Sequence, residues 1–315
     1  MKGPLLFRQP ALPALPALPG KLRLWVTLLS LGFLLSALLN NSAELLQQRL
    51  DLQGWLWLSL GVGLSLLSLL LSATSWRVLL QQLGMMPGSN PVMVAYIETN
   101  QRRHLPGGLA HLATRLSFLR GMNPSAMVSA NAGPSLLAVL LEPLLACFAC
   151  LALVGIGGWQ RGIGAVCLAP LLLLQPRWLQ GLLAWLQQTL APDLGVDPAE
   201  LDPPAPTLRT TLLSGLVGEL AVVMIRFGAF GCCLMAFDLG ASLDWNAWLA
   251  GFALAWAAAL VIPGAPAGLG VFEAVLLIRL GAVVPAAALL VVALSHRGVL
   301  SLADGLAAVT TAPRT

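Results

Sequence analysis

The sequence predicts an all-α, polytopic membrane helix bundle, and two observations support this fold class. Of the 315 residues, 58% are hydrophobic and only 10% are charged, a balance unlike that of ordinary soluble domains. Several apolar runs also reach the roughly 18–20 residues that a helix needs to cross a bilayer. Backbone groups in lipid must be satisfied within the segment, so these runs are expected to be helices. We expect about seven or eight transmembrane helices in a single domain over residues 24–315.

Tryptophans help to place the ends of these spans because their side chains favour the membrane–water interface. Most of the ten tryptophans fall near the ends of apolar runs. The last tract, from residue 263 onward, is apolar but interrupted by proline, glycine and charge. The expected spans are residues 24–39, 55–76, 126–154, 163–174, 212–237, 245–262 and 285–309.

The distribution of basic residues predicts the orientation of the chain. Residues 1–23 form a Pro-rich segment with two lysines and two arginines, and we expect it to be extended and cytoplasmic. Arginines gather again after the second expected span, whereas the loop between the two spans carries only Arg49. The positive-inside rule therefore places the N-terminus and residues 102–120 on the cytoplasmic side of the cell (inner or plasma) membrane.

Residues 178–206 are expected to lie at the membrane surface rather than within it. Trp178 to Leu190 has an apolar stripe and three glutamines, which is typical of an interfacial amphipathic helix. The following residues, 191–206, hold four acidic residues and five prolines. This composition predicts a solvated loop.

A helix break is predicted within "RRHLPGGLAHLATR", residues 102–115. Pro106 removes a backbone donor, and Gly107 and Gly108 loosen the backbone further. From Leu109, leucines recur at helical spacing, which predicts an amphipathic helix that follows a break at Leu105–Gly108 and starts at Gly107–Gly108. Such a helix start presents free N–H groups to an anion. The expected phosphate-binding groups are Arg102, Arg103, Arg115, Gly107 and Gly108.

A similar break is predicted near the other end of the chain, in "IPGAPAGLGVFEAVLLIRLG". Pro106 and Pro266 are 160 residues apart, and each break is followed by an arginine-bearing stretch and then a long span. Two broken or re-entrant Pro/Gly segments at matching places indicate an internal repeat with a transporter-like binding site between its halves. Chance similarity is the alternative, and the pattern leaves open whether the repeat is inverted or parallel.

Charged residues inside the expected spans are further candidates. A charge at mid-bilayer costs roughly 2.5–3.5 kcal/mol on insertion scales, so such residues are usually paired or functional. Glu219 and Arg226 are seven residues apart on one helix face and are candidates for an intramembrane ion pair. The candidates for contact with a headgroup are Glu142, Glu273 and Arg297. Pairs that only hold the bundle together are the alternative, and His296 is expected to be a satisfied packing residue.

Several function classes lack their signatures. No H-E-x-x-H motif, Walker loop or nucleophile elbow is present, so no catalytic residue, metal or cofactor is assigned. Cys147 and Cys150 form a C-x-x-C in the middle of an apolar run, where small packing residues are the simpler interpretation. The net charge of +4 is too small to indicate a nucleic-acid partner.

Four short elements, in order, resemble the lysylphosphatidylglycerol synthase transmembrane-region family, a flippase-like family of integral membrane proteins. They cover about Val92 to Asp304, and they are "HLPGGLAHLATRLSFLRG", "LLEP", "PAGLGVFEAVLL" and "SHRGVLSLAD". Two positions depart from the family pattern. Ala267 replaces a glycine of the third element, and Phe272 stands where a basic residue is usual.

The resemblance implies a membrane bundle that, in the best-understood members, flips an aminoacylated phospholipid. There the region is joined to a soluble aminoacyl-transfer domain. Here the chain ends at Thr315, soon after the last expected span, so we expect a stand-alone member without the synthase domain.

Residues and resemblance together predict a flippase or transporter for a phospholipid or polyprenyl-type lipid with an anionic headgroup. One alternative is a membrane-embedded lipid-modifying transferase, with Glu98 or Glu142 as general base. Another is a lipid-binding partner of a cell-envelope biosynthetic enzyme. A non-enzymatic role is favoured, membrane lipids are the expected partners, and homo-oligomerisation is left open.

Overall fold

The computed structural model describes residues 20–42, 50–83, 85, 88–104, 110–121, 132–156, 166–174, 176–194, 196, 208–262 and 266–311. In these residues the regular secondary structure is helical, which confirms the all-α prediction. Four helices within them are long and apolar enough to cross a membrane, which suggests a multi-pass membrane protein. They are Leu52–Gln82 (α3), Ser135–Gly155 within α6 (Ala132–Ile156), Leu213–Ala236 within α9 (Leu208–Ala236), and Ala286–Thr311 (α12).

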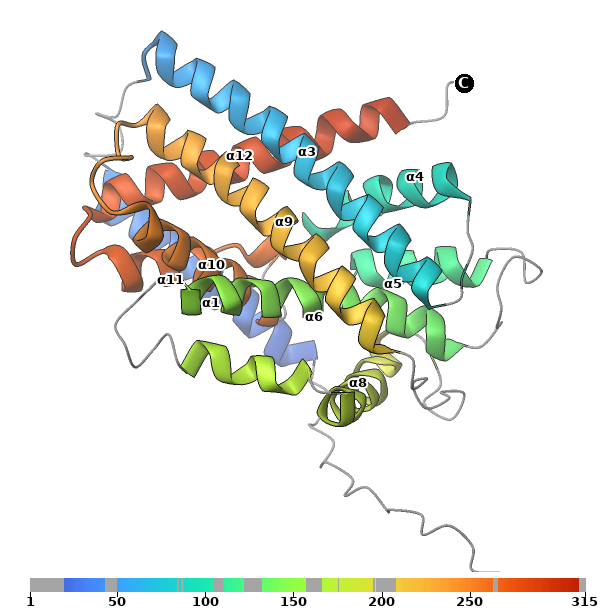
Figure 1. The fold of residues 1–315 in the computed structure, drawn as a ribbon. Helices are drawn as coiled ribbons and strands as arrows, with labels where there is room; N and C mark the ends of the chain where they lie inside the picture. Colours follow the sequence, from blue (N-terminus) through green and yellow to red (C-terminus); the bar gives the residue numbers. More distant parts are fainter. Residues whose placement is uncertain are drawn as a thin grey trace, which may run out of the picture.

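Helices α3 and α9 run antiparallel through the centre of the molecule (Figure 1). Near one end of the contact, the backbone carbonyl of Ala229 lies 3.4 Å from where a Cβ on Gly61 would be. Near the other end, Gln82 and Ser214 exchange side-chain hydrogen bonds of 2.6 and 2.9 Å. Small residues at such a crossing let two backbones approach closely, as is common between membrane helices. The small buried residues of α3 are Gly54, Gly61, Ser65, Ser68, Ser72, Ala73 and Ser75.

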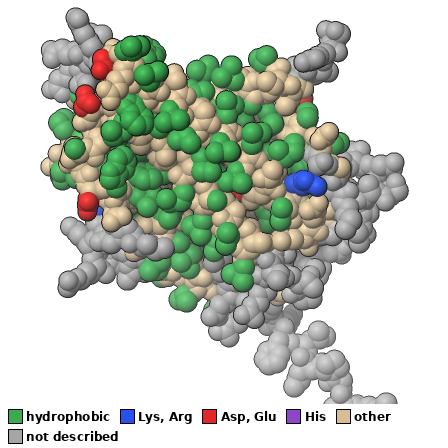
Figure 2. Space-filling model, turned by 45° about the horizontal axis from the view of Figure 1, so that its top comes forward, with side chains coloured by type: hydrophobic (Ala, Val, Ile, Leu, Met, Phe, Trp, Pro, Cys, Tyr) green, Lys and Arg blue, Asp and Glu red, His purple; other side chains and the backbone are tan. Residues whose placement is uncertain are grey.

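The outward faces of these helices are apolar. Figure 2 shows hydrophobic side chains spread across one face, with the prominent acidic and basic groups toward its edges. Leu56, Val217 and Val309 are each more than half exposed, on α3, α9 and α12 respectively. Leucine and valine on the outside of a helix bundle are what a lipid environment favours.

The order of elements repeats along the chain. The first series is α3, α4 (Ser89–Asn100), a 3-10 helix (Gln101–His104), α5 (Ala110–Gly121) and α6. The second series is α9, α10 (Trp245–Val261), a 3-10 helix (Pro266–Gly268), α11 (Val271–Leu280) and α12. The final helix of each series packs against the other series: α6 against α9 and α10, and α12 against α3 and α4.

The structure describes the helices on either side of both predicted breaks, but the centre of the first break, predicted at Leu105–Gly108, lies outside the described residues. Helix α4 ends at Asn100 and α5 begins only at Ala110, with residues 105–109 outside the described residues. The second break lies between α10 and α11, where the backbone takes left-handed φ angles of 49° at Ala267 and 70° at Gly268. The two 3-10 helices contact each other, so the breaks meet although they are far apart in sequence.

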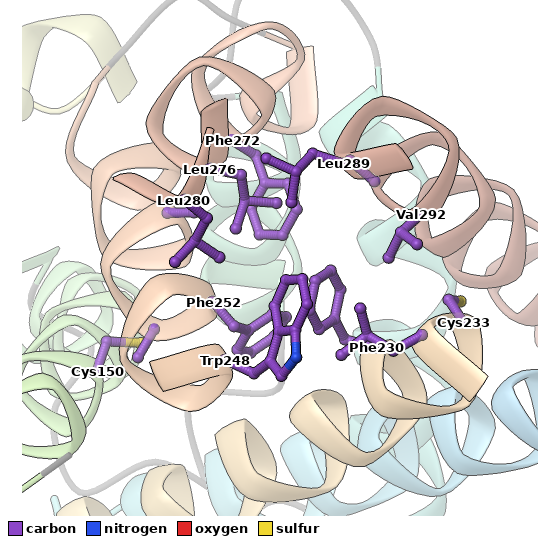
Figure 3. Close-up of a cluster of buried hydrophobic side chains, with 14 of the residues drawn as sticks. Cys150, Phe230, Cys233, Trp248, Phe252, Phe272, Leu276, Leu280, Leu289 and Val292 are labelled. Carbon is purple, nitrogen blue, oxygen red and sulfur yellow. The ribbon is translucent and has the colours of Figure 1, made fainter. Parts of the chain in front are cut away.

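An aromatic core fills the space between α9, α10, α11 and α12. Phe230, Trp248, Phe252 and Phe272 point toward one another there (Figure 3). The ring centroids of Phe230 and Phe252 are 5.2 Å apart, within the range of favourable aromatic pairs. Phe272, which stands where the family pattern has a basic residue, is buried in this core.

Helix α8 (Pro176–Leu190) confirms the predicted amphipathic helix. Leu179 and Leu183 are fully buried on its inner side, whereas Trp178 is exposed. The loop after it was expected to be solvated, but its first residues are packed: Ala191, Leu194 and Val196 are buried.

Some expected segments differ from the structure or extend beyond its description; the span predicted at 126–154, for example, is described only from residue 132. The segment predicted at 163–174 is described from residue 166, and there it ends in a 3-10 helix, Ala169–Leu174. Pro170 lacks a backbone donor, which is consistent with the tighter winding at this point. Helix α1 (Gly20–Asn40) covers the first expected span, and residues 1–19 of the Pro-rich segment lie outside the described residues.

The second break leads to a stability prediction. A Cβ added at Gly268 would overlap the Cβ of Ala259, and the φ of +70° disfavours any L side chain. We expect Gly268→Ala to lower the free energy of unfolding by about 2–3 kcal/mol, through overpacking and left-handed strain. Unfolding in mixed micelles measures this change.

The matched control is Gly298→Ala, at a helical position where a Cβ meets nothing within 4 Å. That substitution should be neutral, or stabilising by about 0.5–1 kcal/mol, because alanine favours helix more than glycine does. Equal effects of the two substitutions would contradict the account of the break.

Candidate functional site

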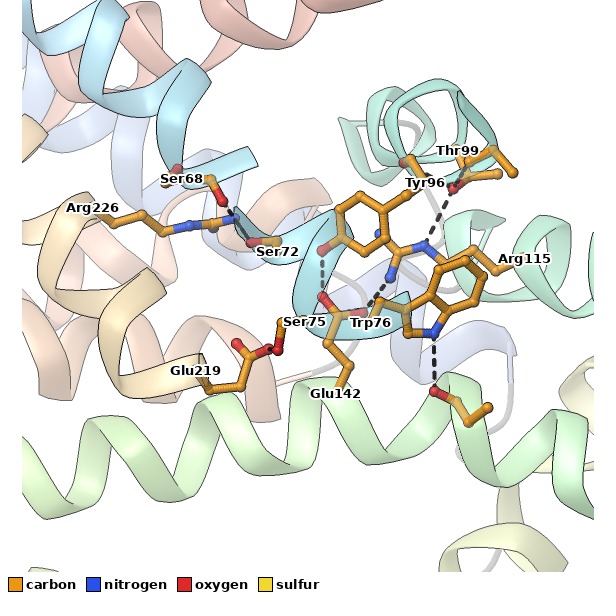
Figure 4. A network of polar contacts seen from close by, with 12 residues as sticks. Ser68, Ser72, Ser75, Trp76, Tyr96, Thr99, Arg115, Glu142, Glu219 and Arg226 are labelled. Atoms are coloured by element: carbon orange, nitrogen blue, oxygen red, sulfur yellow. Dashed lines mark hydrogen bonds and ion pairs between the residues drawn. The ribbon is translucent and has the colours of Figure 1, made fainter. Parts of the chain in front are cut away.

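The first cluster of charged residues lies where α5 meets α6. Arg115 of α5 is only 2% exposed, and its guanidinium forms an ion pair with Glu142 of α6 (Figure 4). Its Nε also donates to Thr99 Oγ1 at 3.2 Å. The guanidinium stacks over the Tyr96 ring, 3.8 Å from its centroid. Arg115 is therefore enclosed and neutralised within the protein.

Tyr96 completes this cluster. Its hydroxyl donates to the other oxygen of Glu142, so the carboxylate is held from two sides. The neighbouring Trp76 donates from Nε1 to the carbonyl of Ala138 at 3.1 Å, which ties α3 to α6. Sequence reasoning missed Tyr96. The available signal was that it is the only tyrosine of the chain.

The second cluster joins the first helix break to α12. Arg103 Nη2 lies 3.2 Å from Asp304 Oδ2, and Asn100 Nδ2 donates to the other carboxylate oxygen at 2.8 Å. Gln101 donates to the Asp304 carbonyl at 3.2 Å. The Arg103 side chain keeps 15% of its surface exposed. Of the other residues predicted here, the Arg102 side chain, Gly107 and Gly108 lie outside the described residues.

The third cluster joins the second helix break to α12, the helix that also carries Asp304. Arg297 of α12 forms an ion pair with Glu273 of α11, and its Nη1 donates to the Ala267 carbonyl at 3.2 Å. Glu273 is fully buried and also accepts from the Gly270 N–H at 2.7 Å, at the start of α11. The carboxylate thus caps α11 and binds α12 at once.

The first and third clusters follow one plan with the charges exchanged. Arg115 on short helix α5 pairs with Glu142 on the next long helix, and Glu273 on short helix α11 pairs with Arg297 on the next long helix. Helix α12 also reaches both breaks, through Arg297 at one and Asp304 at the other. These contacts bring the predicted residues Arg103, Glu273 and Arg297 to the region where the two breaks meet.

Glu219 and Arg226 do not form the ion pair that their spacing suggested. Glu219 accepts a hydrogen bond from Ser75 Oγ at 3.3 Å, whereas Arg226 Nη2 donates to Ser72 Oγ at 3.5 Å. Arg226 also lies over the Trp256 ring, 4.8 Å from its centroid. The prediction of a direct pair is wrong because α3 passes alongside and offers each side chain a nearer hydroxyl (Figure 4).

His296 packs as expected but is not satisfied. Its ring lies 5.5 to 6.0 Å from the centroids of Phe230, Phe252 and Phe272. Neither ring nitrogen has a hydrogen-bond partner among the described residues. This is an unusual position for a polar ring, since buried polar groups are normally paired.

The described residues contain no group of three or more His, Cys, Asp or Glu side chains placed to hold a metal ion. Cys150 is buried and Cys147 partly buried, both with free thiols. Glu98, one of the two residues considered as a general base, is exposed on α4. The chemical feature that the three clusters share is an arginine near a helix break, paired with one carboxylate.

Comparison with known proteins assigns no family, since no family model and no curated protein sequence matches the chain. The similarity to the lysylphosphatidylglycerol synthase transmembrane-region family therefore stays a prediction from four short elements. The geometry of the clusters stands independently of it.

Proposed function

We propose that this protein is a multi-pass membrane protein that moves a lipid with an anionic headgroup between the two leaflets. One observation carries the proposal: two broken helices, at the same place in two series of elements, meet beside Arg103 and Arg297. Broken helices deep in a membrane protein are tolerated where they are buried or line a wet path. In transporters, such paired breaks hold the substrate.

The antiparallel contact of α3 and α9 supports an inverted repeat. These two helices hold the same place in the two series and run in opposite directions. The last helix of each series packs against the other series: α6 contacts α9 and α10, and α12 contacts α3 and α4. In an inverted repeat, the two halves can open alternately to the two sides of the membrane. The arrangement therefore suits a transport function.

Arg103 is the arginine best placed to meet a headgroup phosphate. Its side chain is partly exposed, its carboxylate partner is Asp304, and its Nε has no hydrogen-bond partner among the described residues. Arginine and phosphate form strong charge-assisted hydrogen bonds, so a phosphate would compete with Asp304 for the guanidinium. Arg115, enclosed by Glu142 and Tyr96, is assigned to holding α5 and α6 together instead.

Glu142, Glu273 and Arg297 take a revised role in this proposal. Glu142 is committed to Arg115 and Tyr96, and Glu273 to Arg297 and Gly270. These pairs fix the short helices that follow each break and thereby shape the path. The proposal keeps the expected location, a multi-pass protein of the cell membrane with a cytoplasmic N-terminus, and the expected partner, an anionic lipid.

A transport assay tests this proposal. The purified protein is reconstituted into liposomes that contain an anionic phospholipid with a dithionite-sensitive fluorophore on its headgroup. Wild type should make the inner-leaflet label accessible to dithionite faster than protein-free liposomes do. Arg103→Gln should slow this exchange by about tenfold or more, the effect of losing one hydrogen bond to a charged group.

Arg77→Gln is the matched control, because it removes an equally charged, partly buried side chain near the end of α3. It should leave the rate unchanged. The proposed function would be contradicted if the inner-leaflet label became accessible to dithionite no faster with the wild-type protein than in protein-free liposomes. An unaffected Arg103→Gln variant would contradict the assignment of Arg103.

A further inference from the structure

We propose that Arg226 and His296 form a second site, in the centre of the bundle, for a phosphate-type oxyanion. The inference deepens the proposed function and rests on it for the identification of the ligand as a lipid headgroup. The site lies where α9, α12 and α3 come together, and it was not foreseen from the sequence. From the sequence, Arg226 was expected to pair with Glu219.

Arg226 is a buried cation with few partners. It is 7% exposed, and its only hydrogen bond among the described residues is the long 3.5 Å contact with Ser72. Its Nε has no partner there, and no carboxylate of the described residues lies within ion-pair distance. Removing a charge from water costs several kcal/mol unless it is well paired. The guanidinium carbon lies over the Trp256 ring, 4.8 Å from its centroid, while the Nε–H donor stays without a partner among the described residues.

His296 supplies the second, independent observation. It is 1% exposed, and both ring nitrogens lack a partner among the described residues. Its ring packs against Phe230, which follows Arg226 by one turn of α9. A neutral imidazole always carries one N–H, so at least one donor on this ring is unused.

Helix α3 completes the surroundings. It contacts both α9 and α12, and its Ser72 faces Arg226. Two turns earlier, the buried hydroxyl of Ser65 also lacks a partner among the described residues. Donors without a hydrogen-bond partner among the described residues thus occur on all three helices, and in the same part of the chain Arg226 has no counter-ion within ion-pair distance. This combination matches an oxyanion, whose oxygens accept several hydrogen bonds and supply the missing charge.

The position of this site suits a lipid headgroup in transit. Helix α12 carries His296 next to Arg297, so the site adjoins the region where the two breaks meet. A phosphate that leaves Arg103 would find a second cation further inside the bundle. Two successive weak sites permit passage more readily than one tight site.

A binding measurement in detergent tests this inference without transport. Thermal stabilisation of the protein is recorded against increasing dihexanoyl-phosphatidylglycerol and, separately, against inorganic phosphate, and each series yields an apparent Kd. Arg226→Gln should weaken lipid binding by about tenfold or more, the effect of losing a hydrogen bond to a charged group. Arg77→Gln, the matched control, should bind as wild type does.

His296→Phe covers the case in which Arg226→Gln does not fold. Phenylalanine fits the aromatic surroundings and removes two unpaired nitrogens, so the ligand-free protein should be at least as stable as wild type. Lipid binding should nevertheless weaken about threefold to tenfold, as expected when one hydrogen bond of about 1 kcal/mol is lost. A merely structural histidine would show the gain in stability without the loss of binding.

The outcomes separate this inference from the proposed function. Binding of the lipid alone identifies a headgroup site, and equal binding of inorganic phosphate identifies a site for free phosphate. An apparent Kd unchanged by Arg226→Gln, or by His296→Phe if the first variant does not fold, overturns the inference. Because the assay involves no transport, failure of the transport test leaves this result intact, and the reverse also holds.

Discussion

Replacement of Glu142 by glutamine is expected to lower the free energy of unfolding by about 3–5 kcal/mol, the usual cost of breaking a buried ion pair from one side. The variant would leave the Arg115 guanidinium, 2% exposed, without its counter-ion. It would also weaken the acceptor of the Tyr96 hydroxyl. Reversible unfolding in mixed SDS and mild-detergent micelles measures the change.

The control for this prediction is Glu98→Gln, which makes the same chemical change at an exposed position of α4. Surface substitutions of this kind usually stay within about 0.5 kcal/mol of wild type. The double variant Arg115→Leu with Glu142→Leu should recover much of the loss, because neither charge is then stranded. A loss below about 1 kcal/mol in Glu142→Gln would mean that Arg115 is not held as described.

Replacement of Glu273 by glutamine is expected to have a similarly large effect, about 3–5 kcal/mol. Glu273 is fully buried and is the carboxylate partner of Arg297. A glutamine oxygen can still accept from the Gly270 N–H, so Glu273→Gln isolates the loss of charge. Glu273→Ala removes the cap as well and should cost about 1 kcal/mol more.

The same unfolding measurement checks this difference between the two Glu273 variants. Asp244→Asn serves as the control, since Asp244 is exposed before α10 and its side chain makes no capping hydrogen bond. Equal losses for Glu273→Gln and Glu273→Ala would argue against the capping contact. A negligible loss in both would argue against the ion pair.

Local features of the fold were predictable because they depend on residues close in sequence. Pro106 and Pro266, each with a nearby glycine, marked the places where the helices on either side end and begin. Helical spacing marked α5 and α8, and a long apolar run marked α12. The contact between the breaks was not predictable in this way. It depends on how α12 packs across α3 and α4, which no local pattern encodes.

The partners of the charged residues were the least predictable part of the site. Asp304 meets Asn100 across 204 residues of sequence, so its role at the first break had no local signal. Glu219 and Arg226 have the spacing of a pair, but the serines of α3 intervene. Arg115 looked like a free cation because Glu142, its partner, lies on a different helix.

The central claim, that Arg103 binds the headgroup and does not merely hold α12, is tested most directly by comparing Arg103→Gln with Asp304→Asn in the liposome assay. Both substitutions break the same 3.2 Å contact, but only the first removes the cation. The proposal predicts that Arg103→Gln slows lipid exchange by about tenfold or more, whereas Asp304→Asn retains it. Equal loss of exchange in the two variants would show that the contact is structural and would contradict the claim.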